Sequence, residues 1–170
     1  DVYKRQSLLH PHAGNWFMSG RTPGRSGNAH PNIYPYDSFA TGTTPVFLAV
    51  GNDRQFRLLC EHLGCPQLVA DERFATAGQR SHHRDALKPL LEQALQASDG
   101  PALADALMAI GVPAAPVLGV DAALNHPHTL HREMVVEMEG GYRGLGAPVK
   151  LSRTPASYRH APLAEGDSFE

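Results

Sequence analysis

The stretch that decides the fold is residues 45–64, which read PVFLAVGNDRQFRLLCEHLG. Its first part, residues 45–50, is a short apolar run with β-branched and aromatic side chains that ends at Gly51, as expected of a buried strand. From residue 53 the apolar residues recur instead at the i, i+3, i+4 and i+7 spacing of an amphipathic helix; they are Phe56, Leu59, Cys60 and Leu63. The stretch predicts a strand that leads directly into a helix.

The ends of this helix and two further helices are also visible in the sequence. Asn52 or Asp53 can cap the first turn, and Gly64 can end the last one. Leucine stripes at helical spacing predict the other two helices, over about residues 81–97 and 99–111.

Shorter elements follow these helices. Residues 114–118 are predicted to be extended, and residues 120–131 to form one or two short helices. Two more extended runs are expected at residues 134–139 and 147–151, with the turn chemistry of a hairpin at residues 140–144 between them. This order predicts an α+β fold in which a small antiparallel sheet carries several helices.

The composition excludes several classes of protein. The chain has 170 residues, of which 42% are hydrophobic and 19% charged, and its formal net charge is −2. This composition has no excess of positive charge that would bind nucleic acid or an anionic membrane, so neither partner is expected. No stretch approaches the about 20 apolar residues that cross a bilayer, and the N-terminus lacks a signal-peptide core. With only Cys60 and Cys65, close together, we expect a reduced protein in the cytoplasm.

Neither end of the sequence has the pattern of a domain boundary. Residues 1–6, DVYKRQ, lack an initiator Met and are expected to be a non-native leader. Residues 7–44 contain few periodic apolar residues, which predicts a linker with a functional loop. A small α+β domain is expected over residues 45–152, and a return linker over residues 153–170. We therefore expect a chain that is cut at both ends.

One loop carries an unusual composition. Residues 20–28 read GRTPGRSGN and show neither strand nor helix periodicity. Successive backbone N–H groups and arginines suit a phosphate or a carboxylate. The spacing matches neither a P-loop nor a dinucleotide fingerprint. A flexible linker is therefore the alternative to an anion-binding loop.

Other polar residues suggest sites that the sequence supports less well. The densest histidine cluster, His126, His128 and His131, is interrupted by Pro127 and has no Cys or carboxylate at a matching spacing, so no metal site is expected. Asp53 could be a helix cap or a catalytic carboxylate, because both roles suit a carboxylate directly after a strand. These residues alone predict an α+β domain with an arginine-rich loop at residues 20–28.

Several strings, in order and at matching spacing, resemble motifs of the class III CoA-transferase family, also called the CaiB/BaiF group. They lie within about residues 15–163 and are GNAHPNIYPYDSF at 27–39, LAVGNDRQF at 48–56, DERFAT at 71–76, Arg80 with RDAL at 84–87, GVPAAPV at 111–117, His126-Pro127, MVVE at 134–137 and GAPVKLS at 146–152. The family includes formyl-CoA, carnitine and dicarboxylate CoA-transferases and alpha-methylacyl-CoA racemase.

The resemblance implies a fold and a chemistry. In this family a small α+β domain is inserted into a large nucleotide-fold domain, and two chains interlock as a homodimer. An aspartate of the large domain attacks an acyl-CoA thioester, and an aspartyl-CoA intermediate passes CoA to an acid. By this resemblance the nucleophile lies upstream of residue 1, so this chain holds no catalytic residue and is inactive alone. An acyl-CoA, with succinyl-CoA as a candidate, and a carboxylic acid are then the substrates, and no cofactor is tightly bound.

The same resemblance assigns a site to the arginine-rich loop. In the family this loop faces the active site, which implies substrate-binding roles for Gly24, Gly27, Asn28 and His30. Formyl-CoA transferases carry consecutive glycines here, whereas this sequence has Pro-Gly-Arg-Ser-Gly at 23–27. That departure favours a dicarboxylate or general acyl acceptor over formyl transfer.

Three alternatives stay open at this point. Racemases of the family tend to place a glutamate near the position of Asp53, so an aspartate there favours the transferase branch over a racemase-type fragment. A non-catalytic binding or assembly module could use the same small-domain fold. A metal-binding protein built on the histidines is the third.

Overall fold

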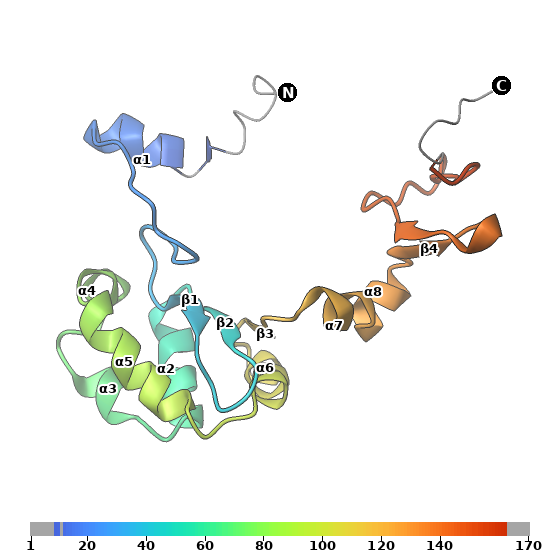
Figure 1. Ribbon diagram of the computed structural model, residues 1–170. Helices are drawn as coiled ribbons and strands as arrows, with labels where there is room; N and C mark the ends of the chain where they lie inside the picture. Colours follow the sequence, from blue (N-terminus) through green and yellow to red (C-terminus); the bar gives the residue numbers. More distant parts are fainter. Residues whose placement is uncertain (1–8, 11, 163–170) are drawn as a thin grey trace. The chain divides into compact units, whose positions relative to one another are not determined.

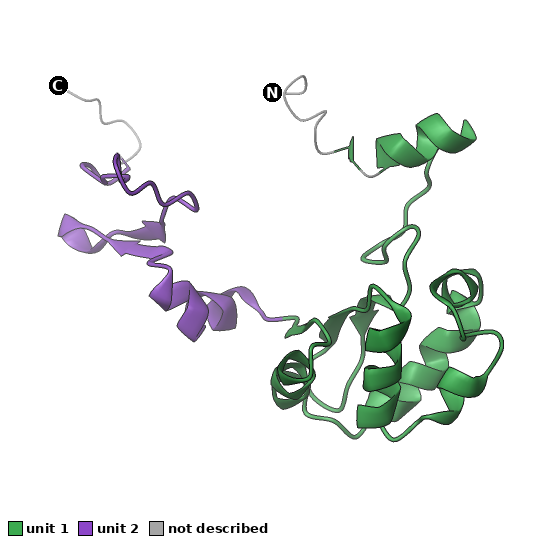
Figure 2. Ribbon diagram, turned by 180° about the vertical axis from the view of Figure 1, so that it is seen from behind, with its two compact units in different colours: residues 1–117 green, residues 118–170 purple. Residues whose placement is uncertain are grey.

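The computed structural model describes residues 9, 10 and 12–162, and the chain divides into two compact units, residues 1–117 and 118–170 (Figures 1 and 2). The first unit contains a three-stranded antiparallel sheet in the order β1-β2-β3. Its strands are β1 (Tyr36–Phe39), β2 (Val46–Ala49) and β3 (Ala114–Pro116). Tyr36 pairs with Ala49 and Phe39 with Val46, which places the buried residues of β1 and β2 on one face.

Helices supply most of the core of the first unit. The helices of this unit are α1 (His12–Ser19), which has no buried residue, and α2 (Asp53–His62), α3 (Gln67–Ala70), α4 (Ala77–His82), α5 (Arg84–Leu95) and α6 (Gly100–Ala109). Helix α5 contacts β1, and α6 contacts β2 and β3. The fully buried side chains of α5 repeat at every fourth position and are Leu87, Leu91 and Leu95. This apolar stripe packs into one core with strand residues such as Val46 and Leu48.

The passage from β2 to α2 is fixed by a side-chain cap. Asn52 has extended backbone angles, and its side chain accepts a hydrogen bond from the Gln55 N–H at 2.9 Å. Gln55 reaches back and accepts from the Gly51 N–H at 2.8 Å. The first bond satisfies a backbone donor that the first turn of a helix leaves free, and the second ties the residue before the cap to that turn. Asn52 is therefore the cap, and Asp53 is the first helical residue.

The second unit is built from short elements. It contains α7 (Val120–Leu124), α8 (Pro127–His131), a 3-10 turn at Glu139–Gly141, and the antiparallel pair β4 (Val135–Glu137) and β5 (Arg143–Leu145). Val135 pairs with Leu145 and Glu137 with Arg143, which also form an ion pair at 3.0 Å. Within the described part of this unit, none of the helices has a buried side chain.

The structure confirms the predicted α+β class, but several elements differ from the expected ones. The hairpin closes earlier, because Gly140 and Gly141 both have positive φ and bring Arg143 opposite Glu137. The expected strand at residues 147–151 is therefore wrong. The single helix expected at 81–97 is divided at His83, whose φ of −104° and ψ of 28° lie outside the helical range and separate α4 from α5.

No helix in the described ranges is both long enough and apolar enough to cross a membrane.

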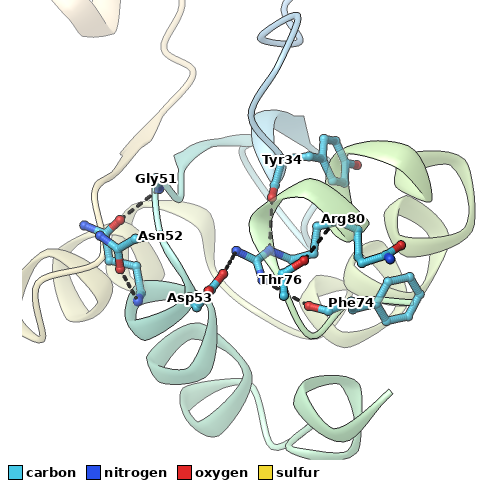
Figure 3. A network of polar contacts seen from close by, with 9 residues as sticks. Tyr34, Gly51, Asn52, Asp53, Phe74, Thr76 and Arg80 are labelled. Atoms are coloured by element: carbon cyan, nitrogen blue, oxygen red, sulfur yellow. Dashed lines mark hydrogen bonds and ion pairs between the residues drawn. The ribbon is translucent and has the colours of Figure 1, made fainter. Parts of the chain in front are cut away.

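A buried arginine joins four segments of the first unit. Arg80, on α4, has no exposed side-chain surface, and its guanidinium donates to three acceptors (Figure 3). They are the carbonyl oxygen of Tyr34 at 3.2 Å, the carbonyl oxygen of Phe74 at 3.0 Å and Oδ1 of Asp53 at 2.7 Å. The guanidinium carbon also lies 4.5 Å from the centroid of the Phe56 ring, a cation–π contact.

The environment of Arg80 determines which of its contacts contribute most to stability. The Asp53 side chain is 55% exposed, so solvent screens the ion pair and limits its net contribution. The two carbonyl acceptors are backbone groups that Arg80 reaches from a fully buried position. A buried charge is tolerated only when its donors are satisfied. We infer that the bonds to Tyr34 and Phe74 matter more than the ion pair.

Replacement of Arg80 by Met should destabilise the chain strongly. The variant keeps most of the aliphatic volume but leaves two backbone carbonyls without their donor, which predicts a loss of roughly 2–4 kcal/mol in the free energy of unfolding. Urea unfolding followed by circular dichroism measures this loss. Arg57→Met, at an exposed position of α2, is the matched control and should change stability by less than about 0.5 kcal/mol. Equal effects of the two substitutions would contradict the role of Arg80.

Candidate functional site

The arginine-rich loop is bounded by two fixed points. The loop begins after α1, at Gly20. Gly20 has a left-handed backbone conformation with a φ of 67°, and its N–H donates to the Trp16 carbonyl at 2.8 Å, which ends the helix. Further on, residues 26–29 form a turn that is closed by the Ala29 N–H and the Ser26 carbonyl at 3.1 Å. Gly27 has a φ of 60° at the first central position of this turn, which favours glycine.

His30 closes the loop and holds the chain that follows it. Its Nδ1 accepts hydrogen bonds from the backbone N–H groups of Asn32 and Ile33, both at 3.1 Å. Because Nδ1 is an acceptor, the neutral ring carries its proton on Nε2. The His30 N–H in turn donates to the Tyr36 carbonyl at 2.9 Å, which ties the loop to the start of β1.

The outer face of the sheet supports the His30 ring. The centroid of the His30 ring lies 5.0 Å from that of the Tyr36 ring, and the two rings are stacked. The centroid of the Tyr36 ring lies 5.6 Å from that of Phe47 on β2, in an edge-to-face arrangement. Aromatic contacts of this kind add directional packing to a partly exposed sheet surface. The half-buried His30 is therefore held by both hydrogen bonds and ring contacts.

Arg84, the first residue of α5, binds the backbone of residues 30 and 31. Its guanidinium donates to the carbonyl oxygens of His30 at 3.3 Å and Pro31 at 3.0 Å. It also donates to the backbone carbonyl and hydroxyl of Ser81, at 3.1 and 3.0 Å. Four of its five N–H groups are thus engaged within the chain. Arg84 fixes the base of the loop against α4 and α5.

A hollow of about 570 Å³ lies between the loop, α1 and Arg84. The titratable residues that line it are His12, Arg21, Arg25 and Arg84, and no Asp or Glu is among the lining residues. The side chains of Arg21 and Arg25 have no hydrogen-bond or ion-pair partner within the described ranges. The wall of the hollow is therefore cationic, and two of its charges have no partner in the part of the chain that the structure describes.

The four residues expected to bind substrate take different positions. Gly24 lines the hollow, and Gly27 and the exposed Asn28 form the tip of the adjoining turn. His30 does not line the hollow, because its ring is turned to the sheet and to the backbone of residues 32 and 33. The geometry gives His30 a positioning role for the loop, and substrate contact by each of the four residues stays a prediction.

Asp53 and the two cysteines have structural roles in this fold. The Asp53 carboxylate is engaged by Arg80. Cys60 and Cys65 are buried free thiols, and the pKa of Cys60 is raised by its hydrogen bond with Cys65 and by burial. Neither Cys60 nor Asp53 lines the hollow. Among the residues described, no three His, Cys, Asp or Glu side chains are grouped as metal ligands.

Residues 4–168 match the family described as CoA-transferase family III. The acetyl-CoA:oxalate CoA-transferase of Acetobacter aceti is 39% identical over 137 residues, which is 81% of this chain and 35% of that protein. The succinate–glutarate CoA-transferase of Agrobacterium fabrum is 35% identical over 148 residues, which is 85% of this chain and 37% of that protein.

A solved structure agrees with these matches. The crystal structure of a CaiB/BaiF family protein from Brucella suis superposes with a TM-score of 0.76 at 38% identity and covers 88% of this chain and 39% of that one. The chain belongs to CoA-transferase family III. It spans a little over a third of the length of the curated relatives that it matches.

Sequence reasoning missed two residues that hold the site together. Arg80 gave no signal of burial, because arginine is normally exposed and its partners are backbone carbonyls far along the chain. Arg84 appears in the sequence only as part of a family motif. Its distance along the chain from the loop gives no sign of its contact with His30 and Pro31. Both contacts depend on tertiary structure.

Substitutions at His30 should separate its two contributions. In His30→Asn, the side-chain oxygen can still accept from the backbone of residues 32 and 33, as in an Asx turn. In His30→Phe, the ring contact with Tyr36 is kept but the acceptor is lost. We expect the amide protons of Asn32 and Ile33 to move upfield in ¹H–¹⁵N spectra of the Phe variant only. An unchanged spectrum in that variant would contradict the acceptor role of Nδ1.

Proposed function

We propose that this chain is the small-domain portion of a class III CoA-transferase, an enzyme that moves CoA from an acyl-CoA to a carboxylic acid. The observation that carries the proposal is the family match over residues 4–168 by a chain that spans little more than a third of its relatives. The fixed, cationic loop beside the hollow supports the same reading, because carboxylates and CoA phosphates are both anions.

The proposed reaction uses a carboxylate nucleophile from outside residues 1–170. An aspartate attacks the thioester carbonyl and CoA leaves as the thiolate, which gives a mixed anhydride. The thiolate then attacks the aspartyl carbonyl, releases the first acid and forms aspartyl-CoA. The carboxylate of the second acid attacks the aspartyl-CoA thioester and expels the CoA thiolate, which gives a second mixed anhydride. The thiolate then attacks the carbonyl of the second acid in this anhydride, forms the new acyl-CoA and releases the aspartate carboxylate. No net oxidation occurs, so no tightly bound cofactor is proposed.

Dicarboxylic acids are the substrates that we propose for the acceptor side. Oxalate, succinate and glutarate appear in the names of the relatives described above, and all three carry two carboxylates. The Pro-Gly-Arg-Ser-Gly string at residues 23–27 supports this choice over formyl transfer, because arginine supplies a countercharge that a run of glycines lacks. Succinyl-CoA is the acyl donor that we propose.

The assembly that we propose follows from the family. Residues 7–44 would form the linker and loop, residues 45–152 the small domain, and residues 153–170 the return to a large domain. Two full-length chains would interlock as a homodimer. The free, buried thiols of Cys60 and Cys65 support a reducing compartment, and we propose the cytoplasm.

A segment exchange tests the proposal. The part of the Acetobacter aceti enzyme that aligns with this chain is replaced by the corresponding residues from this chain, and CoA transfer is measured by separating the CoA esters. We expect transfer above background, although small errors in positioning can reduce the rate by about a hundredfold. The 170-residue chain alone should show no transfer.

Two results would contradict the proposal. A chimera that melts cooperatively and assembles as its parent does, yet moves no CoA, would show that this segment cannot serve a transferase. Transfer by the 170-residue chain alone would show that the nucleophile lies within it.

A further inference from the structure

We propose that Arg21 and Arg25 bind the free carboxylate of a dicarboxylic acid in the hollow beside the loop. The inference rests on the proposed function, since it assigns a role within the CoA-transfer site. It concerns residues that neither the fold nor the core requires: both side chains are exposed and lie in an irregular segment.

The charges around the hollow favour an anion. Three arginines line it and no carboxylate among the lining residues offsets them. Like charges gathered on one concave surface repel each other, and a bound anion relieves that repulsion. Asn15 and Ser19 add neutral hydrogen-bonding groups on the α1 side. The lining thus offers hydrogen-bond donors and positive charge together, as carboxylate recognition needs.

The three arginines differ in what they have left to offer. Four of the five N–H groups of Arg84 are used by Ser81, His30 and Pro31, so this residue acts mainly as scaffold and background charge. Arg21 and Arg25 have no such partners within the described ranges, and each keeps a full planar fork for a bidentate contact. The geometry therefore assigns ligand binding to the two loop arginines.

The chemistry of a dicarboxylic acid explains why such a site is needed. One carboxylate is converted to a thioester during CoA transfer and loses its charge. The other keeps its charge throughout and must be paired or solvated at each step. A monocarboxylic acid of the same length has no group for this site. The loop arginines would therefore discriminate between the two classes of acid by charge pairing.

The probes are succinate, propionate and inorganic phosphate, titrated into the ¹⁵N-labelled 170-residue chain at low ionic strength. Succinate should shift the amide signals of residues 21–26 in a saturable way, and propionate should bind more weakly. Arg21→Gln with Arg25→Gln should weaken succinate binding by about tenfold or more, the loss expected for a charge-assisted contact. Arg54→Gln with Arg57→Gln removes the same charge from exposed positions of α2 and should change binding less than twofold.

Each contrary result overturns a stated part of the inference. Equal losses in the two double variants would mean that net charge, and not the hollow, determines binding. Phosphate that competes with succinate and binds more tightly would assign the site to a phosphate of CoA instead of an acid. Shifts outside residues 12–32 and Arg84 would place the anion elsewhere. Thermal unfolding of all variants controls for folding.

The outcomes also separate this inference from the proposed function. Saturable succinate binding at residues 21–26, together with an inactive segment-exchange chimera, would keep the anion site and reject the transferase. An active chimera that keeps its preference for oxalate over a monocarboxylic acid after both loop arginines are replaced would keep the transferase and reject this role of the arginines.

Discussion

The position of the Arg80 side chain is the constraint on which the rest of the first unit depends. A guanidinium without any exposed surface links α4 to the start of α2, to the turn at Phe74 and to the segment before β1. A buried guanidinium is costly unless acceptors surround it, and the three acceptors of Arg80 come from three other segments, so these four segments must come together in one arrangement. Hydrophobic burial brings them into contact, whereas Arg80 specifies how they meet.

The same arrangement holds the base of the loop next to the hollow in place. The Tyr34 carbonyl is held by Arg80, and four residues earlier the His30 ring lies on Tyr36 and accepts from two backbone amides. Arg84, four residues after Arg80, holds the carbonyls of His30 and Pro31. One short stretch, α4 with the start of α5, therefore fixes both ends of the chain that leads into β1. The exposed arginines at 21 and 25, whose side chains have no partner among the described residues, are the ones that we propose for ligand binding.

The spacing of apolar residues predicted the elements whose buried residues are all apolar. It did not predict elements in which a polar residue takes a buried position. Strand β2 and helix α2 were predictable from residues 45–64, because their apolar residues follow simple periods. Strand β1 was not, since its inward residues include Asp37, which is buried beside Lys88 at 2.9 Å and breaks the apolar alternation. The family motifs implied a substrate-binding role for the loop, which stays a prediction. They could not show that His30 faces the sheet, because that depends on a stack with Tyr36 that only the folded chain creates.

Amide hydrogen exchange in Arg80→Met tests most directly whether Arg80 holds the base of the loop. The reporters are the N–H groups of His30 and Val50, which donate to the carbonyls of Tyr36 and Pro35, each at 2.9 Å, and the N–H of Leu103 in α6 reports on global unfolding. We predict that exchange at His30 and Val50 accelerates more than exchange at Leu103. Equal acceleration at all three sites, or acceleration confined to residues 74–82, would contradict this account.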